Sequence, residues 1–409
     1  MTARWVIPAF AAYGIELEYA IVSATSLEVM PIAPRLLDNS AIEMQPGFES
    51  PLGWSDELAA HVAEIRNTLP VPTLDGLADA FQKAIQSANR KLAAHGAQLM
   101  PAGMHPWMDP RRETALGHGA DDRIYREYDR IFDCCRHGWS NIQSMHLNLP
   151  FAGDVEFERL HAAVRLVLPL VPALAASSPV ADGRYTGYRD FRLAVYATNS
   201  SRFPTITGKV LPDTVTTREE YERAILQPMY HEIHPADPKG LLRHEWLNAR
   251  GAIARFDRSA IEIRLADTQE CPVGDVAIAG AIVAVVKSIY EERRSSLPAQ
   301  QSISTDRLAK TLARTVHLAE DAMIDDDEYL GLLGQTSRPR RVGELWTTLL
   351  ADETGPWRGH VDFILEHGTL ATRIVQAAGE DYSRPRLREV YTGLLECLAQ
   401  GKRFRPWPG

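Results

Sequence analysis

The sequence predicts an α+β protein in which a sheet-rich part precedes a helical part. Segments of strand type, such as residues 12–22, 98–102 and 141–150, all lie before residue 270. From residue 274 onward the apolar side chains recur with helical spacing. Strands and helices that are segregated along a chain favour α+β architecture over alternating βαβ units. We therefore expect residues 1–409 to form one unit, with a sheet-rich core over 12–272 and a helical region over 273–409.

The first expected strand covers residues 12–22. Tyr13, Ile15, Leu17, Tyr19 and Ile21 recur at every second position, so they share one face of a strand. Glu16 and Glu18 fall on the opposite face. Residues 31–55 are punctuated by proline and glycine and predict a loop with short strands.

Residues 57–68 are ambiguous between helix and strand. Glu57 and Glu64 are seven residues apart, a spacing that fits one face of a helix, so the residues alone favour an amphipathic helix. A clearer helical period covers residues 73–95 and ends at Gly96. A short strand is expected over 98–102.

The middle of the chain alternates loops, helices and strands. Residues 105–120 predict an ordered loop, 121–135 a helix, and 141–150 a strand with Ser144, His146 and Asn148 on one face. An apolar helix over 155–177 should be kinked by Pro169 and Pro172. Residues 183–213 have no clean period, 218–233 predict a helix, and 244–267 contain strands. Five helices are then expected, over 274–295, 303–323, 341–352, 357–378 and 384–400.

Composition excludes several classes of protein. The 409 residues carry 44 basic and 53 acidic side chains, a net charge of −9, and no clustered basic surface of the kind that binds nucleic acid. The four cysteines form no CxxC pair, which argues against a disulfide framework or a zinc ribbon. We see no signal-peptide core at the N-terminus. The longest apolar helix candidate, near 160–176, contains Arg165 and two prolines. A soluble cytoplasmic protein is expected.

The acidic face of the first strand is a candidate metal site. Glu16 and Glu18 are two residues apart, which on a strand means about 6.5–7 Å between their Cα atoms. Carboxylate oxygens suit Mg²⁺ or Mn²⁺. The alternative is an exposed sheet face with solvated glutamates.

A second charged strand covers Ile261 to Asp267. Glu262 and Arg264 share one face of it, and they could either pair with each other or bind a metal and a substrate anion, respectively. His146 stands between Ser144 and Asn148 on a polar strand face, where it is either a ligand or a core histidine with satisfied hydrogen bonds. No phosphate-binding P-loop, dinucleotide-binding glycine fingerprint, GxSxG elbow or HExxH zinc motif is present.

Taken in order, these segments resemble the glutamate–cysteine ligase superfamily, and more closely its bacterial carboxylate–amine ligase branch. The similar segments are Gly14–Glu18, Glu57–Pro70, Ser144–Asn148, Thr186–Arg192 and Ser259–Asp267. The resemblance implies a glutamine-synthetase-like core, in which a curved antiparallel sheet forms a funnel with helices packed on its outside. It also implies that Glu57–Thr68 is a strand.

The resemblance implies an ATP-dependent ligase that uses Mg²⁺ or Mn²⁺ and joins an amino acid or other carboxylate to an amine, through an acyl phosphate. The bond formed would be an amide, and a γ-glutamyl amide is one candidate. Arg264 and Glu262 would be catalytic. The other implied roles are metal binding by Glu16, Glu18, Glu57, Glu64, His146 and Glu262, and binding of substrate or ATP by Asn148, Tyr188, Arg189, Arg192 and Arg264.

The sequence departs from the family pattern near the expected substrate pocket. Arg66-Asn67 falls where the family has Glu-Leu-x-Thr-Pro, and Ala176-Ser177-Ser178-Pro179 replaces Ala-Asn-Ser-Pro. The identities of the acid and the amine therefore stay open. Two other classes also stay open: a metal-dependent amide or phosphate hydrolase that uses the same carboxylates, and a non-catalytic binding protein. A homo-oligomer is compatible with the sequence.

Overall fold

A seven-stranded antiparallel sheet organises the molecule. The structure, a computed structural model, describes residues 6–37, 51–117, 122–336 and 338–406. Its main sheet has the strand order β2–β3–β1–β5–β9–β8, and β4 pairs with the second half of β1. These strands are β1 (Gly14–Ser23), β2 (Leu52–Asp56), β3 (Val62–Asn67), β4 (Ala97–Met100), β5 (Ser144–Pro150), β8 (Ala252–Arg255) and β9 (Ala260–Asp267). The predicted mixture of helices with an antiparallel sheet is confirmed.

The central strand β1 has the two faces that its sequence predicts. Ile15, Leu17 and Ile21 are fully buried in the main hydrophobic core. Glu16 and Glu18 alternate with them and lie on the other face of the sheet. The apolar face fixes the register of the strand, because a slip by one residue would bring both glutamates into the core.

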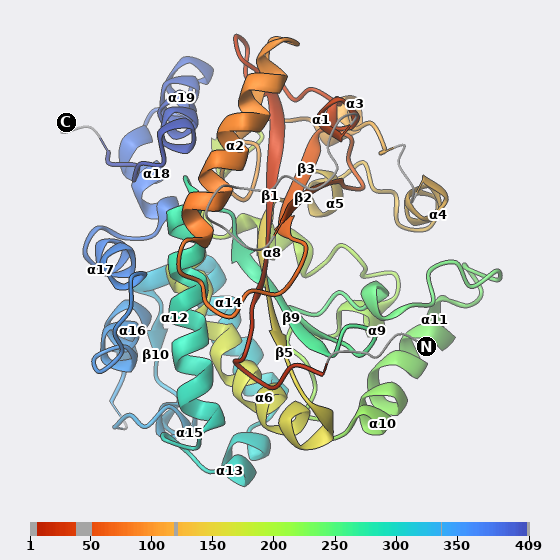
Figure 1. The fold of residues 1–409 in the computed structure, drawn as a ribbon, viewed down its shortest axis with the longest axis vertical. Coiled ribbons are helices and arrows are strands. Elements are labelled where there is room, and N and C mark those ends of the chain that lie inside the picture. The colour runs from red at the N-terminus through yellow and green to blue at the C-terminus, as the bar shows by residue number, and fades with distance from the viewer. Residues whose placement is uncertain (1–5, 38–50, 118–121, 337, 407–409) are drawn as a thin grey trace.

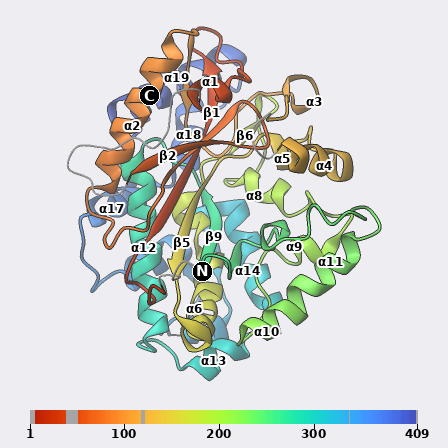
Figure 2. The same ribbon diagram turned by 45° about the vertical axis from the view of Figure 1, so that its right-hand side comes forward.

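Helices lie on both sides of the strands. In both views α2 and α17 lie to one side of the sheet, and α4 and α11 lie to the other (Figures 1 and 2). Up to residue 233 the described helices are α1 (Ala33–Leu37), α2 (Leu77–Ala93), α3 (Pro110–Glu113), α4 (Asp122–Phe132), α5 (His137–Ser140), α6 (Gly153–Val167), η1 (Leu168–Leu170), α7 (Pro172–Ala175), α8 (Phe191–Tyr196), α9 (Pro204–Thr207), α10 (Arg218–Tyr221), the π-helical turn η2 (Glu222–Leu226) and α11 (Gln227–Ile233).

The rest of the chain is mainly helical. It contains η3 (Glu245–Leu247), α12 (Pro272–Tyr290), α13 (Leu297–Ser302), α14 (Thr305–Leu318), η4 (Ala319–Asp321), α15 (Asp327–Leu332), α16 (Val342–Leu349), α17 (Arg358–His367), α18 (Leu370–Ala378) and α19 (Arg384–Gln400). Two small two-stranded sheets complete the described elements: β6 (Val180–Ala181) with β7 (Arg184–Tyr185), and β10 (Met323–Ile324) with β11 (Arg340–Arg341).

The helix α12 is more apolar than the sequence analysis allowed. It is the one described helix long and apolar enough, by length and composition, to cross a membrane, with a mean hydropathy of 1.7. However, 72% of that window is buried inside the protein, where α12 contacts α2, α6 and α17. A helix that packs on most sides is expected to be apolar nearly all round. Its composition is thus explained by burial in the core.

Three predicted elements differ from the structure, and one of them, the loop expected over 105–120, contains the short helix α3. Residues 57–68 are not a helix: β2 ends at Asp56, a turn follows, and β3 begins at Val62, so the continuous strand that the resemblance implied is also interrupted. The helix expected over 357–378 is two helices, because Gly368 adopts a φ of 86° between them. The predicted loop over 31–55 lies partly outside the described residues, and α1 and β2 occupy its described ends.

Candidate active site

A cavity of about 480 Å³ opens on the polar face of the sheet. All six residues predicted as metal ligands line it, although they come from four strands and one turn that are far apart in the sequence. These residues are Glu16, Glu18, Glu57, Glu64, His146 and Glu262. The fold therefore brings together what the sequence could only suggest separately.

Strand register explains how the carboxylates meet. On one side of β1, Glu18 is paired directly with Glu64 of β3. On the other side, Glu16 is paired with His146 of β5. Directly opposed residues on antiparallel strands have their Cβ atoms about 4.5–5.5 Å apart on the same face. Glu16 and Glu18, two residues apart on β1, are thus paired with His146 and Glu64, and the four side chains are potential ligands of one site.

A β-bulge brings the β9 motif to the same cavity. Asn148 of β5 is paired with Glu262 of β9, and the register then shifts between Met145 and Leu147. In that interval Arg264 and Leu265 together face the single residue His146. The bulge lies beside the carboxylates, where Glu262 and Arg264 both line the cavity.

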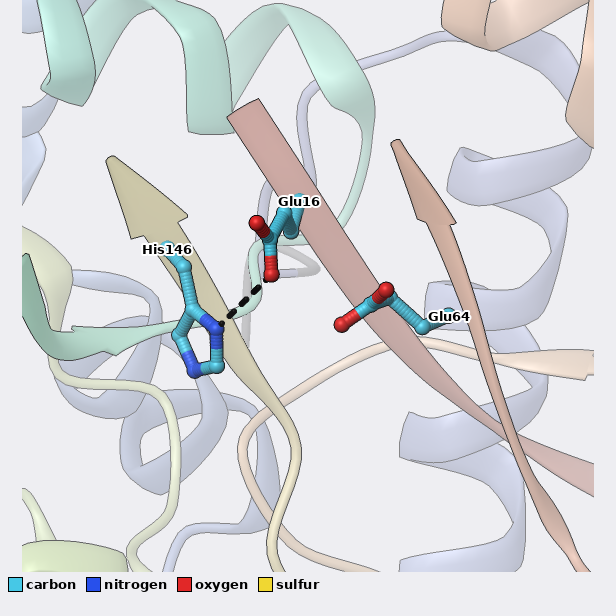
Figure 3. Close-up of side chains that lie close together, drawn as sticks. All are labelled: Glu16, Glu64 and His146. Carbon is cyan, nitrogen blue, oxygen red and sulfur yellow. Dashed lines mark hydrogen bonds and ion pairs between the residues drawn. The ribbon is translucent and has the colours of Figure 1, made fainter. Parts of the chain in front are cut away.

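The acidic side chains form two overlapping groups with the composition of a cation site. Glu16, Glu64 and His146 have ligand atoms within 4.8 Å of one another, and so do Glu18, Glu57 and Glu64. Figure 3 shows Glu16 and Glu64 projecting from their strands toward the space beside the imidazole of His146. Glu64 belongs to both groups. Hard oxygen ligands with one imidazole suit Mg²⁺ or Mn²⁺.

Hydrogen bonds orient the ligand atoms. His146 Nδ1 lies 3.4 Å from Glu16 Oε2, and its Nε2 lies 2.9 Å from the hydroxyl of Ser144. The Ser144 amide and hydroxyl both donate to Glu18 Oε2, at 2.7 and 3.0 Å. Asn148 Nδ2 donates to Glu16 Oε1 at 3.1 Å. The polar stripe Ser144-His146-Asn148 therefore holds the two glutamates of β1.

The protonation behaviour of the cluster indicates a shortage of positive charge. Burial and the neighbouring carboxylates Glu64 and Glu18 raise the pKa of Glu57 well above its ordinary value. Burial and the charge of Glu16 raise the pKa of Glu64 to about 7. Burial opposes a charge on His146, but its hydrogen bond to Glu16 and the charge of Glu18 outweigh this and raise its pKa to about 8. A divalent cation would relieve this repulsion, so the residues present fit one.

Arginines surround the carboxylates. Arg264 Nε donates to Glu262 Oε1 at 2.5 Å, and Arg255 Nη1 lies 3.1 Å from Glu262 Oε2. Arg66 Nη1 lies 2.6 Å from Glu64 Oε1, and Arg258 Nη1 lies 3.8 Å from Glu16 Oε1. Sequence reasoning singled out only Arg264. Arg66 could have been found by its strand spacing of two from Glu64, whereas no local signal identifies Arg255 and Arg258.

The three predicted binding residues near 190 divide into two groups. Arg192 lines the cavity, but it is buried, and it forms a close ion pair with Asp267 and donates to the carbonyl of Leu265. Arg189 and Tyr188 are not among the residues that line the cavity. Arg189 instead lies over the ring of Tyr185, and Tyr188 is 37% exposed.

A second cavity of about 380 Å³ adjoins the first. The two cavities share Glu16, Arg66 and Arg258 as lining residues. The second cavity is also lined by the predicted binding residue Asn148, together with the apolar side chains of Ile7, Pro70 and Pro150. Glu16, Arg66 and Arg258 therefore stand at a boundary between two spaces, each large enough for a small ligand.

The chain is similar to a known protein family over most of its length. The model of the glutamate-cysteine ligase family 2 matches residues 12–377, which extends the similarity beyond residue 272, where the sequence motifs end. An uncharacterised protein of Archaeoglobus fulgidus is 36% identical over 236 residues, which cover 58% of this chain and 63% of that protein. The chain thus spans less than two thirds of that relative.

Two further proteins extend the comparison. A protein of Nocardioides sp. named "Putative glutamate–cysteine ligase 2-1" is 27% identical over 290 residues, which cover 70% of each chain. The crystal structure of a glutamate–cysteine ligase from Francisella tularensis in complex with AMP has a similar fold, with a TM-score of 0.58. That match covers 97% of this chain and 90% of the other at 10% identity, so it establishes likeness of fold alone.

Proposed function

The chain belongs to the glutamate-cysteine ligase family 2, and from this premise we propose that it is an ATP-dependent ligase that joins a small carboxylic acid to an amine. The observation that carries the proposal is the carboxylate cluster of Glu16, Glu18, Glu57 and Glu64 with His146 in the first cavity, where Glu16 also lines the second cavity. Such a boundary suits a reaction in which a nucleotide and an acid must meet at one point. Residues 1–409 would act as one catalytic unit.

A nucleotide in the second cavity is the arrangement that these side chains favour. Its apolar patches suit a base, and Arg66 and Arg258 stand where it meets the first cavity. Arginine binds phosphate oxygens well because its planar guanidinium donates two parallel hydrogen bonds. The Francisella ligase is a complex with AMP, which supports use of an adenine nucleotide by this chain.

Mg²⁺ or Mn²⁺ would be held by Glu16, Glu18, Glu57, Glu64, Glu262 and His146. A bound divalent cation would neutralise charge on the phosphates and polarise the phosphoryl group. The chain's own contribution is to hold these ligands in place: Ser144 and Asn148 fix the carboxylates of β1 by hydrogen bonds. Arg264 donates a hydrogen bond to Glu262 and would stabilise the transferring phosphoryl group.

The proposed reaction has two steps. A carboxylate oxygen of the acid attacks the γ-phosphorus of ATP, and the bond from that phosphorus to the β-phosphate oxygen breaks. ADP departs, and the acid has become an acyl phosphate. An amine then attacks the acyl carbon, and phosphate leaves with the electron pair of the broken C–O bond. Both steps depend mainly on positioning and on the stabilisation of charge, which the cluster and the arginines could supply.

The variant Glu262→Gln tests this assignment. The variant keeps the shape of the side chain but removes a buried charge that Arg264 and Arg255 contact. We expect acid- and amine-dependent ADP release in the presence of Mg²⁺ to fall by about 10² to 10³-fold. The matched control is Glu366→Gln, whose side chain is 75% exposed, and both variants are first compared with wild type by thermal melting. Turnover near wild type in folded Glu262→Gln would refute the assignment.

A further inference from the structure

The first cavity has an aromatic wall to which the proposed reaction assigns no role. Five aromatic side chains line it, and they are contributed by four elements. They are Tyr125 and Tyr128 of α4, Trp139 of α5, Tyr196 of α8 and Trp246 of η3. Each is only partly buried, so each presents ring surface to the cavity.

The wall is preorganised by contacts among its rings. Tyr128 packs against Trp139 and Trp246, with ring centroids 5.4 and 5.8 Å apart. The Trp139 indole Nε1 donates to the carbonyl of Asn199 at 3.3 Å. His244 stacks on Trp246 at a centroid distance of 5.1 Å. Rings held in this way can bind a flat apolar group without first losing side-chain entropy.

A carboxylate oxygen without a hydrogen-bond partner among the described residues stands beside the wall. Asp56, the last residue of β2, lines the cavity, and its Oδ2 is buried with no hydrogen-bond partner among the described residues. The Tyr125 hydroxyl lies 3.4 Å from the backbone carbonyl of Asp56, which brings the wall and this strand end together. A buried carboxylate oxygen without a donor favours a cationic ligand.

The basic side chains of the cavity do not favour an amine substrate that itself carries a carboxylate, as an amino acid does. Arg66, Arg258 and Arg264 each face a carboxylate of the cluster. Arg255 faces Glu262, and Arg192 is held by Asp267. If a bound cation displaced these arginines from their carboxylates, the arginines would bind the phosphates and the acyl substrate before they bound the amine. An amine with an apolar body fits these charges better than an amino acid does.

We infer that the acceptor of the proposed ligase is a primary amine attached to an aromatic ring, with the ring against Trp139, Tyr128 and Trp246 and the ammonium toward Asp56. The inference rests on the proposed function. Aromatic rings attract both another ring and a nearby ammonium, by stacking and by cation–π attraction. A small acceptor such as cysteine would leave most of this wall unfilled.

The proton balance of the second step is consistent with this placement. The ammonium first loses one proton to solvent, and the neutral nitrogen attacks the acyl carbon of the acyl phosphate. The C–N bond forms, the C–O bond to phosphate breaks, and phosphate leaves with that electron pair. Phosphate takes the second proton of the nitrogen as it becomes hydrogen phosphate.

Calorimetry with a set of matched small molecules tests the inference. Phenethylamine, ethylamine, putrescine, cysteine and 3-phenylpropionate are titrated into the full chain with Mg²⁺ and a non-hydrolysable ATP analogue. We expect phenethylamine to bind at least ten-fold more tightly than any other of the five. Trp246→Ala and Asp56→Asn should each weaken phenethylamine about ten-fold and leave nucleotide binding unchanged. Tyr382→Ala, whose ring lies outside the cavity, is the control and should change neither.

The possible failures are distinguishable. Equal or tighter binding of ethylamine, putrescine or cysteine, or no effect of Trp246→Ala on phenethylamine, would overturn the inference. The proposed function is tested separately by ADP release with mixtures of acids and each amine. If turnover with cysteine equals turnover with phenethylamine, the ligase assignment stands and the inference fails. If no mixture gives ADP and the nucleotide does not bind, the proposed function fails.

Discussion

The buried ion pair between Arg192 and Asp267 should be one of the costliest places in the chain to alter. The side chains of Arg192 and Asp267 are 2% and 0% exposed. Asp267 also accepts hydrogen bonds from the Ser177 amide at 2.8 Å and the Ser178 hydroxyl at 2.7 Å. Three donors therefore converge on one carboxylate with no access to water.

The variant Asp267→Asn perturbs this arrangement with almost no change in volume. It leaves the charge of Arg192 buried and unpaired, and breaking a buried pair typically costs about 3–5 kcal/mol. The asparagine keeps one acceptor oxygen, but its NH₂ group faces donors, so a further hydrogen bond of about 1 kcal/mol is lost. We expect the free energy of unfolding to fall by about 5 kcal/mol, a large part of the 5–15 kcal/mol typical of a native protein.

Urea unfolding followed by circular dichroism measures this loss. The matched control is Asp133→Asn, because Asp133 pairs with Arg111 at 2.7 Å while both side chains are more than half exposed. An exposed pair contributes about 0–1 kcal/mol, so the control should change little. A loss below about 1 kcal/mol in Asp267→Asn would refute the view that this pair is closed to water. So would equal losses in the two variants.

Two further predictions concern the core. Burial lowers the pKa of His161 to about 3, whereas its value in the unfolded chain is near 6.5. Between these pH values the unfolded chain binds one more proton than the folded protein, so the free energy of unfolding falls as the pH drops from 6.5 toward 3. Between pH 7 and pH 5 this should cost about 2 kcal/mol, and His161→Leu should remove that part of the pH dependence in urea unfolding; an unchanged pH slope would contradict the reasoning. Gly251→Ala would bring a methyl group within 2.6 Å of Leu265 Cγ and should cost about 1–3 kcal/mol. In the same unfolding assay Gly331→Ala, with open space around it, should cost nothing, and equal effects would contradict the close approach.

The sequence predicted the parts of the site that a single strand carries. Alternation alone placed Glu16 and Glu18 on one face of β1. It likewise placed Glu262 and Arg264 together on one face of β9, because strand geometry is local. The sequence could not predict that Glu18 would be paired with Glu64, since register between strands depends on the whole topology.

The missed residues share a physical reason. Asp56 lies at a strand end, and the aromatic wall comes from four elements that no local pattern links. The spacing of seven between Glu57 and Glu64 fits one face of a helix, yet in the structure a turn separates the two residues. The strand was not predicted from the residues, because the six residues of β3 are too few to show a clear alternation. Tyr188 and Arg189 were expected at the site from residue type and resemblance, and the structure does not bring them to the cavity.

The bulge in β9 changes how its motif is read along the chain. In an unbroken strand, Glu262 and Asp267 are an odd number of residues apart and would project from opposite faces. Here Glu262 is paired with Asn148 and Asp267 with Ser144, two residues that share a face of β5. The extra residue reverses the phase of alternation between them. Loss of one residue between Arg264 and Asp267 would leave the two acids four residues apart, so a regular strand could then hold both on one face without the bulge. With the present spacing, pairing without the bulge would turn either Glu262 or the aspartate that anchors Arg192 away from that face.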